Sequence, residues 1–309
     1  MSTPRRSPPL ARAALITLVS AAAVAGCAPK GQGDGADTQL HSGDLGEPQS
    51  PFGRLVFEEL YYAGAKPLEA GGDHYYADQF FELENKSDEP VALAGLCLGD
   101  AAGLAGAINP GNTPSGLATE DPDHVYLGNV WCLPPEAQGE VLRPGDTLVL
   151  AHDGTNHAPY SALDLSDADF EAYNQRDDGA DLDYPTVPNL TRFHFTGGYD
   201  WLVTVFGPSM VLFVTADLEA LEKVRVDGLG AVKVPIGEVV DGVDTLMDAE
   251  SGEYKRLPLG VDGGFAYVSG TYTGESLSRV RGADGRLQDT NDSAADFELR
   301  AAPAPREAR

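Results

Sequence analysis

Short apolar runs separated by turn residues recur along most of the chain. In the clearest run, over 80–84, Phe81 and Leu83 alternate with Glu82 and Glu84, which is the period of two of a β-strand. Runs of this kind predict strands over 54–62, 80–84, 91–98, 125–132, 147–151, 200–206, 209–214, 231–243, 264–272, 277–280 and 297–299. Many short strands with turn signals between them are typical of an all-β sandwich.

Only two segments favour short helices. Ser166 stands as an N-cap before the first, 167–175, and Asp169 occupies the capping-box position. The second, 216–224, has acidic residues early, Lys223 late and an apolar stripe.

Glycine and proline are abundant, at 36 and 22 residues, which indicates a loop-rich protein. The pair Gly207-Pro208 lies between the runs 200–206 and 209–214. The sequence therefore predicts a hairpin there.

The first residues have the layout of an export signal. Arg5, Arg6 and Arg12 precede an apolar stretch over 13–25 that is too short to span a bilayer as a helix. A small residue stands directly before Cys27, as in the pattern that the bacterial lipoprotein pathway reads. The sequence predicts cleavage before Cys27 and lipidation of its thiol, so that the acyl chains anchor the protein in a membrane.

Two other interpretations of this signal stay open. One is an ordinary secretory signal with an incidental cysteine, and the other is twin-arginine export directed by Arg5 and Arg6. The lipoprotein interpretation places the protein in the cell envelope, outside the cytoplasm. Ala28 stands where an aspartate favours inner-membrane retention in some diderm bacteria, so in such an organism we expect the outer membrane.

The predicted organisation has four parts: a lipoprotein signal peptide over 1–26, a flexible acidic tether over 27–50, a β-sandwich over 51–300 and a disordered tail over 301–309. The segments 99–124 and 152–197 look like insertions between sandwich strands. A function peculiar to this protein is expected in those loops.

The chain carries 48 acidic and 21 basic side chains, which gives a formal net charge of −27. Phosphate contacts need clustered Lys and Arg, so this balance disfavours nucleic acid as a partner. It also disfavours contact with an anionic membrane surface beyond the lipid anchor, and it leaves cation binding open.

The sequence contains three cysteines. With Cys27 used by the lipid, Cys97 and Cys132 remain as an even pair in an oxidising compartment, and we predict a disulfide between them. The chain-entropy model gives about 4 kcal/mol for closing such a loop. The alternative is a pair of buried free thiols.

Several segments carry a family resemblance: DQFFELEN over 78–85, LRPG over 142–145, DGV over 241–243, SLSRV over 276–280, DTND over 289–292 and Asp296-Phe297. In this order they resemble the signature of lamin-tail domains. The chain is also similar to a family of bacterial lipoproteins of unknown function that carries the same pattern. The resemblance implies an immunoglobulin-like β-sandwich without catalytic residues. Bacterial members often sit beside secreted hydrolases as accessory modules, which implies surface attachment or partner binding.

The motif residues suit structural roles. Glu82 faces away from the apolar side of its run, so it can accept hydrogen bonds from a neighbouring loop. Arg279 is the expected partner of Glu82 or Asp296, and Asp289 and Asn291 suit Asx-turns. The predicted structural set is Asp78, Glu82, Asn85, Arg279, Asp289, Asn291 and Asp296.

Carboxylates concentrate in the insertion over 152–197. Oxygen ligands at alternate positions around a glycine are what Ca²⁺ prefers. The calcium candidates are Asp177, Asp178, Asp181 and Asp183. The twelve-residue calcium loop with its closing Glu is missing from this run, so a solvated acidic loop is the other interpretation. Apart from calcium, the sequence predicts no cofactor.

The sequence contains no H-x-x-x-H pair, no G-x-S-x-G elbow and no S-x-x-K motif. The prediction is a non-catalytic, lipid-anchored module that binds an envelope protein or a glycan. The alternative is a secreted hydrolase that uses acidic residues of 152–197, with calcium. Aromatic residues that would line a glycan surface, or else pack in the core, are Tyr126, Trp131, Tyr160, Tyr184 and Phe193.

Overall fold

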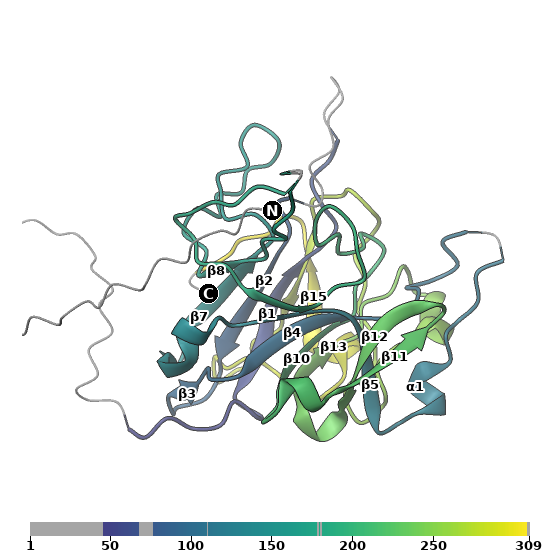
Figure 1. Ribbon diagram of the computed structural model, residues 1–309, viewed down its shortest axis with the longest axis horizontal. Helices are drawn as coiled ribbons and strands as arrows, with labels where there is room; N and C mark the ends of the chain where they lie inside the picture. Colours follow the sequence, from purple (N-terminus) through teal and green to yellow (C-terminus); the bar gives the residue numbers. More distant parts are fainter. Residues whose placement is uncertain (1–45, 68–76, 110, 178, 180, 308–309) are drawn as a thin grey trace, which may run out of the picture. The chain divides into compact units, whose positions relative to one another are not determined.

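Two β-sheets contain most of the strands in the described part of the chain. The structure is a computed structural model, and it describes residues 46–67, 77–109, 111–177, 179 and 181–307. Figure 1 shows both sheets, with β1, β2 and β7 in the first and β4, β10 and β13 in the second. The predicted all-β, sandwich-like fold with loops is confirmed. The predicted signal peptide, Cys27 and the tether up to residue 45 lie outside the described residues.

The first sheet has six strands in the order β15-β14-β1-β2-β7-β8. Their bounds, in chain order, are β1 Leu55–Tyr61, β2 Phe80–Asn85, β7 Thr147–Ala151, β8 Phe170–Glu171, β14 Ser276–Arg279 and β15 Phe297–Arg300. All neighbours are antiparallel except β7 and β8, which run parallel.

The second sheet has seven strands, with β11-β12-β5-β4-β10-β13 in order and β9 paired to β5. Their bounds are β4 Leu96–Ala101, β5 His124–Cys132, β9 Thr191–His194, β10 Met210–Val214, β11 Glu222–Val226, β12 Leu229–Pro235 and β13 Val239–Val243.

The remaining elements are short. They are the strand pair β3 Val91–Ala92 and β6 Val141–Leu142, the helices α1 Leu117–Glu120 and α2 Ser293–Asp296, and the 3-10 turns Pro135–Gly139, Leu218–Ala220, Ile236–Glu238 and Ser251–Tyr254. Among the described residues, no helix has the length and apolar character that a bilayer crossing requires.

The main apolar core lies between the two sheets. Leu83 and Leu277 of the first sheet and Leu98 and Leu212 of the second belong to one cluster of buried side chains. Because side chains alternate along a strand, the neighbours of Leu98 and Leu212 point to the other face of the second sheet. There Cys97, Val211 and Phe213 form a second cluster with the strands β5 and β12.

The insertion over 152–197 packs on the outer face of the first sheet. Phe80 and Val149 point outward from β2 and β7 and are buried with Leu163, Leu165 and Val187 of the insertion. This third cluster fixes the insertion against the sandwich, so its loops are held by apolar contacts as well as by the chain at their ends.

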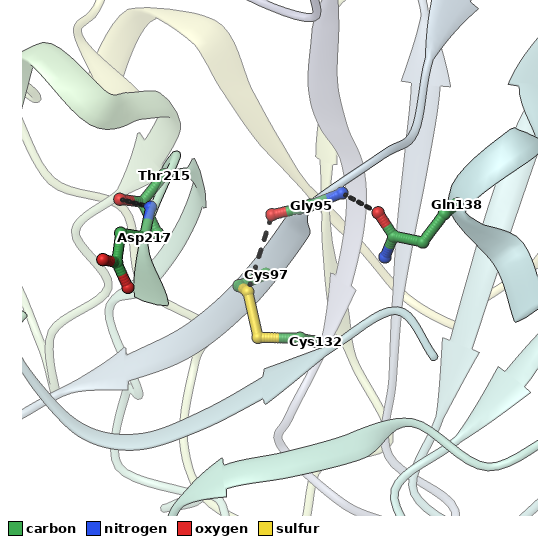
Figure 2. The surroundings of a disulfide bond; sticks show 6 residues. All are labelled: Gly95, Cys97, Cys132, Gln138, Thr215 and Asp217. Carbon is green, nitrogen blue, oxygen red and sulfur yellow. Dashed lines mark hydrogen bonds between the residues drawn. A yellow bond between two sulfur atoms is a disulfide. The ribbon is translucent and has the colours of Figure 1, made fainter. Parts of the chain in front are cut away.

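A disulfide joins Cys97 to Cys132, as the cysteine count predicts. The two residues are direct partners in the register of β4 and β5. Figure 2 shows the bond beside Gly95, whose backbone N–H donates to Gln138 at 3.0 Å. The cross-link lies on a face of the second sheet that is already buried, because Cys97 and Cys132 are only 3% and 6% exposed.

The helix predicted over 167–175 is wrong. Phe170–Glu171 is strand β8, which pairs with β7, and the Asp169 side chain accepts the Val149 N–H at 2.7 Å. The edge of β7 offers backbone N–H and C=O groups that need hydrogen-bond partners. Pairing with β8 supplies these partners, and this outweighs the preference of Ser166 and Asp169 for capping a helix.

The helix predicted over 216–224 is also wrong, because Glu222–Val226 is strand β11 and pairs with β12. The turn between these strands holds Asp227 and Gly228 at φ of 50° and 84°. This Asp-Gly pair is the strongest short-range hairpin signal, and it overrides the helical stripe before it.

The hairpin predicted around Gly207-Pro208 does not form. β10 is bonded on one side to β4 and on the other to β13, so no edge of β10 remains for residues 200–206. The strand predicted over 264–272 is reduced to a single bridge between Thr245 and Ala266.

The segment 301–307, predicted as part of a disordered tail, lies against the outer face of the first sheet. The backbone N–H of Ala304 donates to Glu59 at 3.2 Å, and that of Arg306 donates to Glu82 at 3.0 Å. Buried carboxylates require such donors. The hydrogen bonds that Glu82 was expected to accept from a neighbouring loop therefore come from the end of the chain.

Candidate functional site

The structure separates the four predicted calcium ligands. Asp181 is 6% exposed. Asp177 and Asp183 are exposed, and the Asp183 carboxylate accepts a hydrogen bond from Asn189 at 3.1 Å. Asp178 lies outside the described residues. The acidic run therefore does not act as one ligand loop within the described part, and only Asp181 joins a buried site.

Asp181 meets two carboxylates from other segments. One carboxylate oxygen each from Asp153, Asp181 and Asp200 lies within 4.8 Å of the others. Asp153 and Asp200 are 9% and 3% exposed. We call these three side chains the acidic cluster. Carboxylate oxygens are the donors that hard divalent cations prefer, so this is the group of described residues best suited to hold a metal.

The end of β7 places Asp153. Its backbone N–H donates to Ala77 at 3.2 Å. The next residue, Gly154, lies so close to Val187 that an added Cβ would stand 2.5 Å from the valine Cγ2. A glycine is required here, because no other residue lets the chain pass this closely.

Glu171 of β8 links the segments that carry Asp153 and Asp181. Its Oε2 accepts the Gly154 N–H at 2.7 Å, and its Oε1 accepts the Tyr184 N–H at 2.8 Å. The Asp181 carboxylate is itself held by the backbone N–H of Asn174 at 2.7 Å. The local hydrogen bonds therefore fix Asp181 before any ligand arrives.

A buried tryptophan positions Asp200. The neighbouring Trp201 is 1% exposed and packs in the main core. Its ring stacks on His152 with the centroids 4.8 Å apart, and its Nε1 donates to Asp100 at 2.8 Å. The burial of Trp201 therefore places the adjacent Asp200 inside the protein as well.

Burial and mutual repulsion dominate the electrostatics of the acidic cluster. Burial, followed by the charges of Asp200, Asp181 and Glu171, raises the pKa of Asp153 to about 9. Burial and then Asp181 raise the pKa of Asp200 to about 7. Burial also raises the pKa of Asp181, and that of Glu171 to about 7. Like charges held together out of water resist ionisation unless a positive charge joins them.

Exposed apolar side chains stand close to two members of the cluster in the sequence. Leu182, next to Asp181, is 59% exposed, and Tyr199 and Leu202, on either side of Asp200, are 40% and 38% exposed. Because the carboxylates of Asp181 and Asp200 lie close together, these three exposed side chains are carried by segments that meet at the cluster, and we call them the apolar rim. In Figure 1 the teal and green loops that carry it lie in the upper part of the view.

The aromatic residues predicted for a glycan surface divide between core and surface. Trp131 is fully buried, and Phe193 is half-buried under Lys223, whose Nζ lies 4.7 Å from the ring centroid. Tyr126 is half-buried and donates to Asp121 at 2.6 Å. Tyr184 is half-buried and Tyr160 is 38% exposed, so these two remain available at the surface.

The shortest ion pair of Arg279 is with Asp241, which was not predicted, and the predicted partner Asp296 forms a longer one. Its Nη2 lies 2.6 Å from Asp241 Oδ2, and its Nη1 lies 3.6 Å from Asp296 Oδ2. Its other predicted partner, Glu82, instead accepts the backbone N–H of Arg306.

The other motif residues make local or inter-strand bonds. Asp78 accepts the Tyr61 hydroxyl at 3.0 Å, and Asp289 pairs with Lys86 at 3.0 Å. Asn291 adopts a left-handed φ of 53°. Asn85 donates to the backbone carbonyls of Glu89 and Leu142 at 2.8 and 2.9 Å, and Asp296 accepts from the Thr290 N–H and hydroxyl at 2.8 Å.

Fold and site together define an all-β sandwich whose insertion gathers carboxylates. The family described as "Protein of unknown function (DUF4876)" matches residues 143–304, more than half of the chain, and the chain belongs to this family. The chain is similar to the crystal structure of a DUF4876 family protein from Bacteroides thetaiotaomicron VPI-5482, with a TM-score of 0.65 and 25% identity. That match covers 79% of this chain and 70% of the other. No curated protein matches the chain.

Sequence reasoning missed Asp153 and Asp200. Each stands outside the acidic run, and each comes close to Asp181 only because the insertion folds back on itself. The one local signal for Asp153 is that it follows a continuous apolar run, at a strand end where functional loops begin.

Proposed function

We propose that this protein is a lipid-anchored module of the cell envelope that binds a glycan or an envelope protein without catalysing a reaction. The pattern that ends at Cys27 supports the anchor, and the lamin-tail-like motifs support an immunoglobulin-like accessory domain. The sandwich is the scaffold in this proposal, and the insertion over 152–197 with the segment that follows it is the binding surface.

The observation that carries the binding role is the apolar rim. Leu182, Tyr199 and Leu202 are exposed beside buried carboxylates, whereas most large apolar side chains in the described residues are buried. Exposed apolar groups that gather beside polar ones are typical of interaction sites. Tyrosine suits such a surface because its ring packs on a sugar or side chain while its hydroxyl stays hydrated.

The acidic cluster gives little support to the alternative function, a hydrolase that uses acidic residues of the insertion. The three carboxylates are 9% exposed or less, and a glycosidase pair must reach a sugar from both sides of the scissile bond. Turnover of a glycan that is abolished by Asp181→Ala, with the fold intact, would replace the binding proposal by this one.

The anchor predicts that Cys27→Ala releases the protein from membranes. The full chain should fractionate with the membranes, and the variant should appear in the soluble extracytoplasmic fraction, because it has lost the acyl chains that hold it. Immunoblots of the two fractions measure the ratio. A Ser20→Ala variant, changed within the same signal, serves as the control and should stay with the membranes. Persistence of Cys27→Ala in the membrane fraction would rule the anchor out.

The binding surface predicts that Tyr199→Ser combined with Leu202→Ser weakens ligand binding at least about tenfold, as expected for central contacts of an interface. Peptidoglycan fragments, envelope polysaccharides and isolated envelope proteins are the probes, with binding followed by calorimetry. Leu259→Ser is the matched control, because Leu259 is 75% exposed but lies outside the rim. Equal loss in both variants, or no loss in the rim variant, would contradict the proposal.

A further inference from the structure

We propose that the acidic cluster of Asp153, Asp181 and Asp200 binds one divalent cation of the calcium class. This inference is independent of the ligand that the apolar rim takes. It rests on the spacing of the carboxylates, on an unpaired buried oxygen and on the charge around the cluster.

The spacing fits one ion. Two oxygens that bind the same Ca²⁺ at its usual ligand distance are separated by at most about 5 Å. One oxygen from each of Asp153, Asp181 and Asp200 lies within 4.8 Å of the other two. All three donors are hard oxygens without sulfur or imidazole, which favours calcium or magnesium over zinc or copper.

The second observation is an oxygen without a hydrogen-bond donor. Asp200 is 3% exposed, and its Oδ1 is buried and accepts no hydrogen bond from the described residues. Its carboxylate faces the other two of the cluster. A buried carboxylate oxygen without a donor is costly unless a cation satisfies it.

The concentration of carboxylates at the cluster also favours a bound cation. The ion pairs between described residues all involve other acids, so none of them joins Asp153, Asp181 or Asp200 to a lysine or arginine of the described part of the chain. Glu171 adds a fourth carboxylate nearby. A single divalent cation would offset much of this charge, and it would tie the segment after β7 to the two loops that carry Asp181 and Asp200.

Ca²⁺-dependent thermal unfolding of the full chain tests the site. Millimolar Ca²⁺ should raise the unfolding temperature by about 5 °C relative to chelator. A shift of this size is expected when the free Ca²⁺ concentration is well above the Kd of the site. Asp200→Asn should lose this shift. In chelator, the variant should unfold at the same temperature as the unmodified chain or higher, because one repelling charge has been removed. A carboxylate that only holds the fold together would instead lower the unfolding temperature in chelator.

Asp183→Asn is the matched control, since Asp183 lies in the same acidic run but is exposed and outside the cluster. It should keep the full shift. Tb³⁺ luminescence gives a second readout that does not depend on stability, because Trp201 adjoins Asp200. Excitation of tryptophan should sensitise one Tb³⁺ per chain, displaced by Ca²⁺, in the unmodified chain and in Asp183→Asn but not in Asp200→Asn. Absence of both the shift and the luminescence, or their retention in Asp200→Asn, would overturn the proposal.

Discussion

Arg279→Met is expected to lower the free energy of unfolding by about 3–5 kcal/mol, the range for removing one partner of a buried ion pair. Arg279 is 3% exposed, and Asp241 is 7% exposed. Arg279 lies on β14 of the first sheet and Asp241 on β13 of the second, so their contact of 2.6 Å joins the two sheets.

The loss is large because Arg279 satisfies several buried acceptors at once. Its Nε donates to the Phe57 carbonyl at 2.7 Å and its Nη1 to the Gln288 carbonyl at 3.1 Å. Methionine fills part of the same volume but donates no hydrogen bond. Asp241 would keep the backbone N–H groups of Phe57 and Gly242 but would lose its counter-charge.

Urea unfolding followed by tryptophan fluorescence measures the effect. The control is Arg286→Met, because Arg286 pairs with Asp88 on the surface, where the two side chains are 53% and 77% exposed. An exposed pair contributes less than about 1 kcal/mol, so this variant should stay close to the unmodified chain. A double variant, Arg279→Met with Asp241→Leu, should recover part of the loss by removing the stranded charge. Equal free energies of unfolding for Arg279→Met and Arg286→Met would show that the pair between the sheets does not stabilise the fold.

The contrast between strands and helices shows what the sequence can predict here. The strand over 147–151 is β7 with the same bounds, because a continuous apolar run that follows Pro144-Gly145 has few other conformations that bury it. Both helix predictions failed where a strand edge or an Asp-Gly turn decided the outcome. In each case the deciding partner, β7 or β12, lies outside the segment. A local pattern cannot include that partner.

The acidic cluster shows the same limit at the level of a site. Asp181 was found from the sequence because it stands in a dense acidic run. Asp153 and Asp200 carry no such signal, and they join Asp181 only through Gly154, Glu171 and the burial of Trp201. Composition could therefore point to the insertion that carries Asp153 and Asp181, whereas the grouping of the three carboxylates required the fold.

Removal of the disulfide by Cys97→Ala with Cys132→Ala is expected to lower the free energy of unfolding by about 4 kcal/mol, the chain-entropy value for a loop of this size. The two cysteines are separated by 35 residues. That loop contains α1 and all of the first insertion, 99–124, so the unfolded chain gains many conformations once the cross-link is lost. The two side chains also contribute to the buried cluster of the second sheet, and the alanines add a smaller packing loss there.

Urea unfolding with and without dithiothreitol separates the cross-link from the packing. Reductant should lower the unfolding midpoint of the unmodified chain nearly to that of the double variant, since both then lack the cross-link. It should leave the double variant unchanged, because that variant keeps only Cys27 of the three cysteines. A midpoint of the unmodified chain that is insensitive to reductant, together with two reactive thiols in denatured protein, would mean that the cysteines are free. The disulfide requires an oxidising compartment, so its presence in protein isolated from cells would also support export, and two free thiols would remove that support.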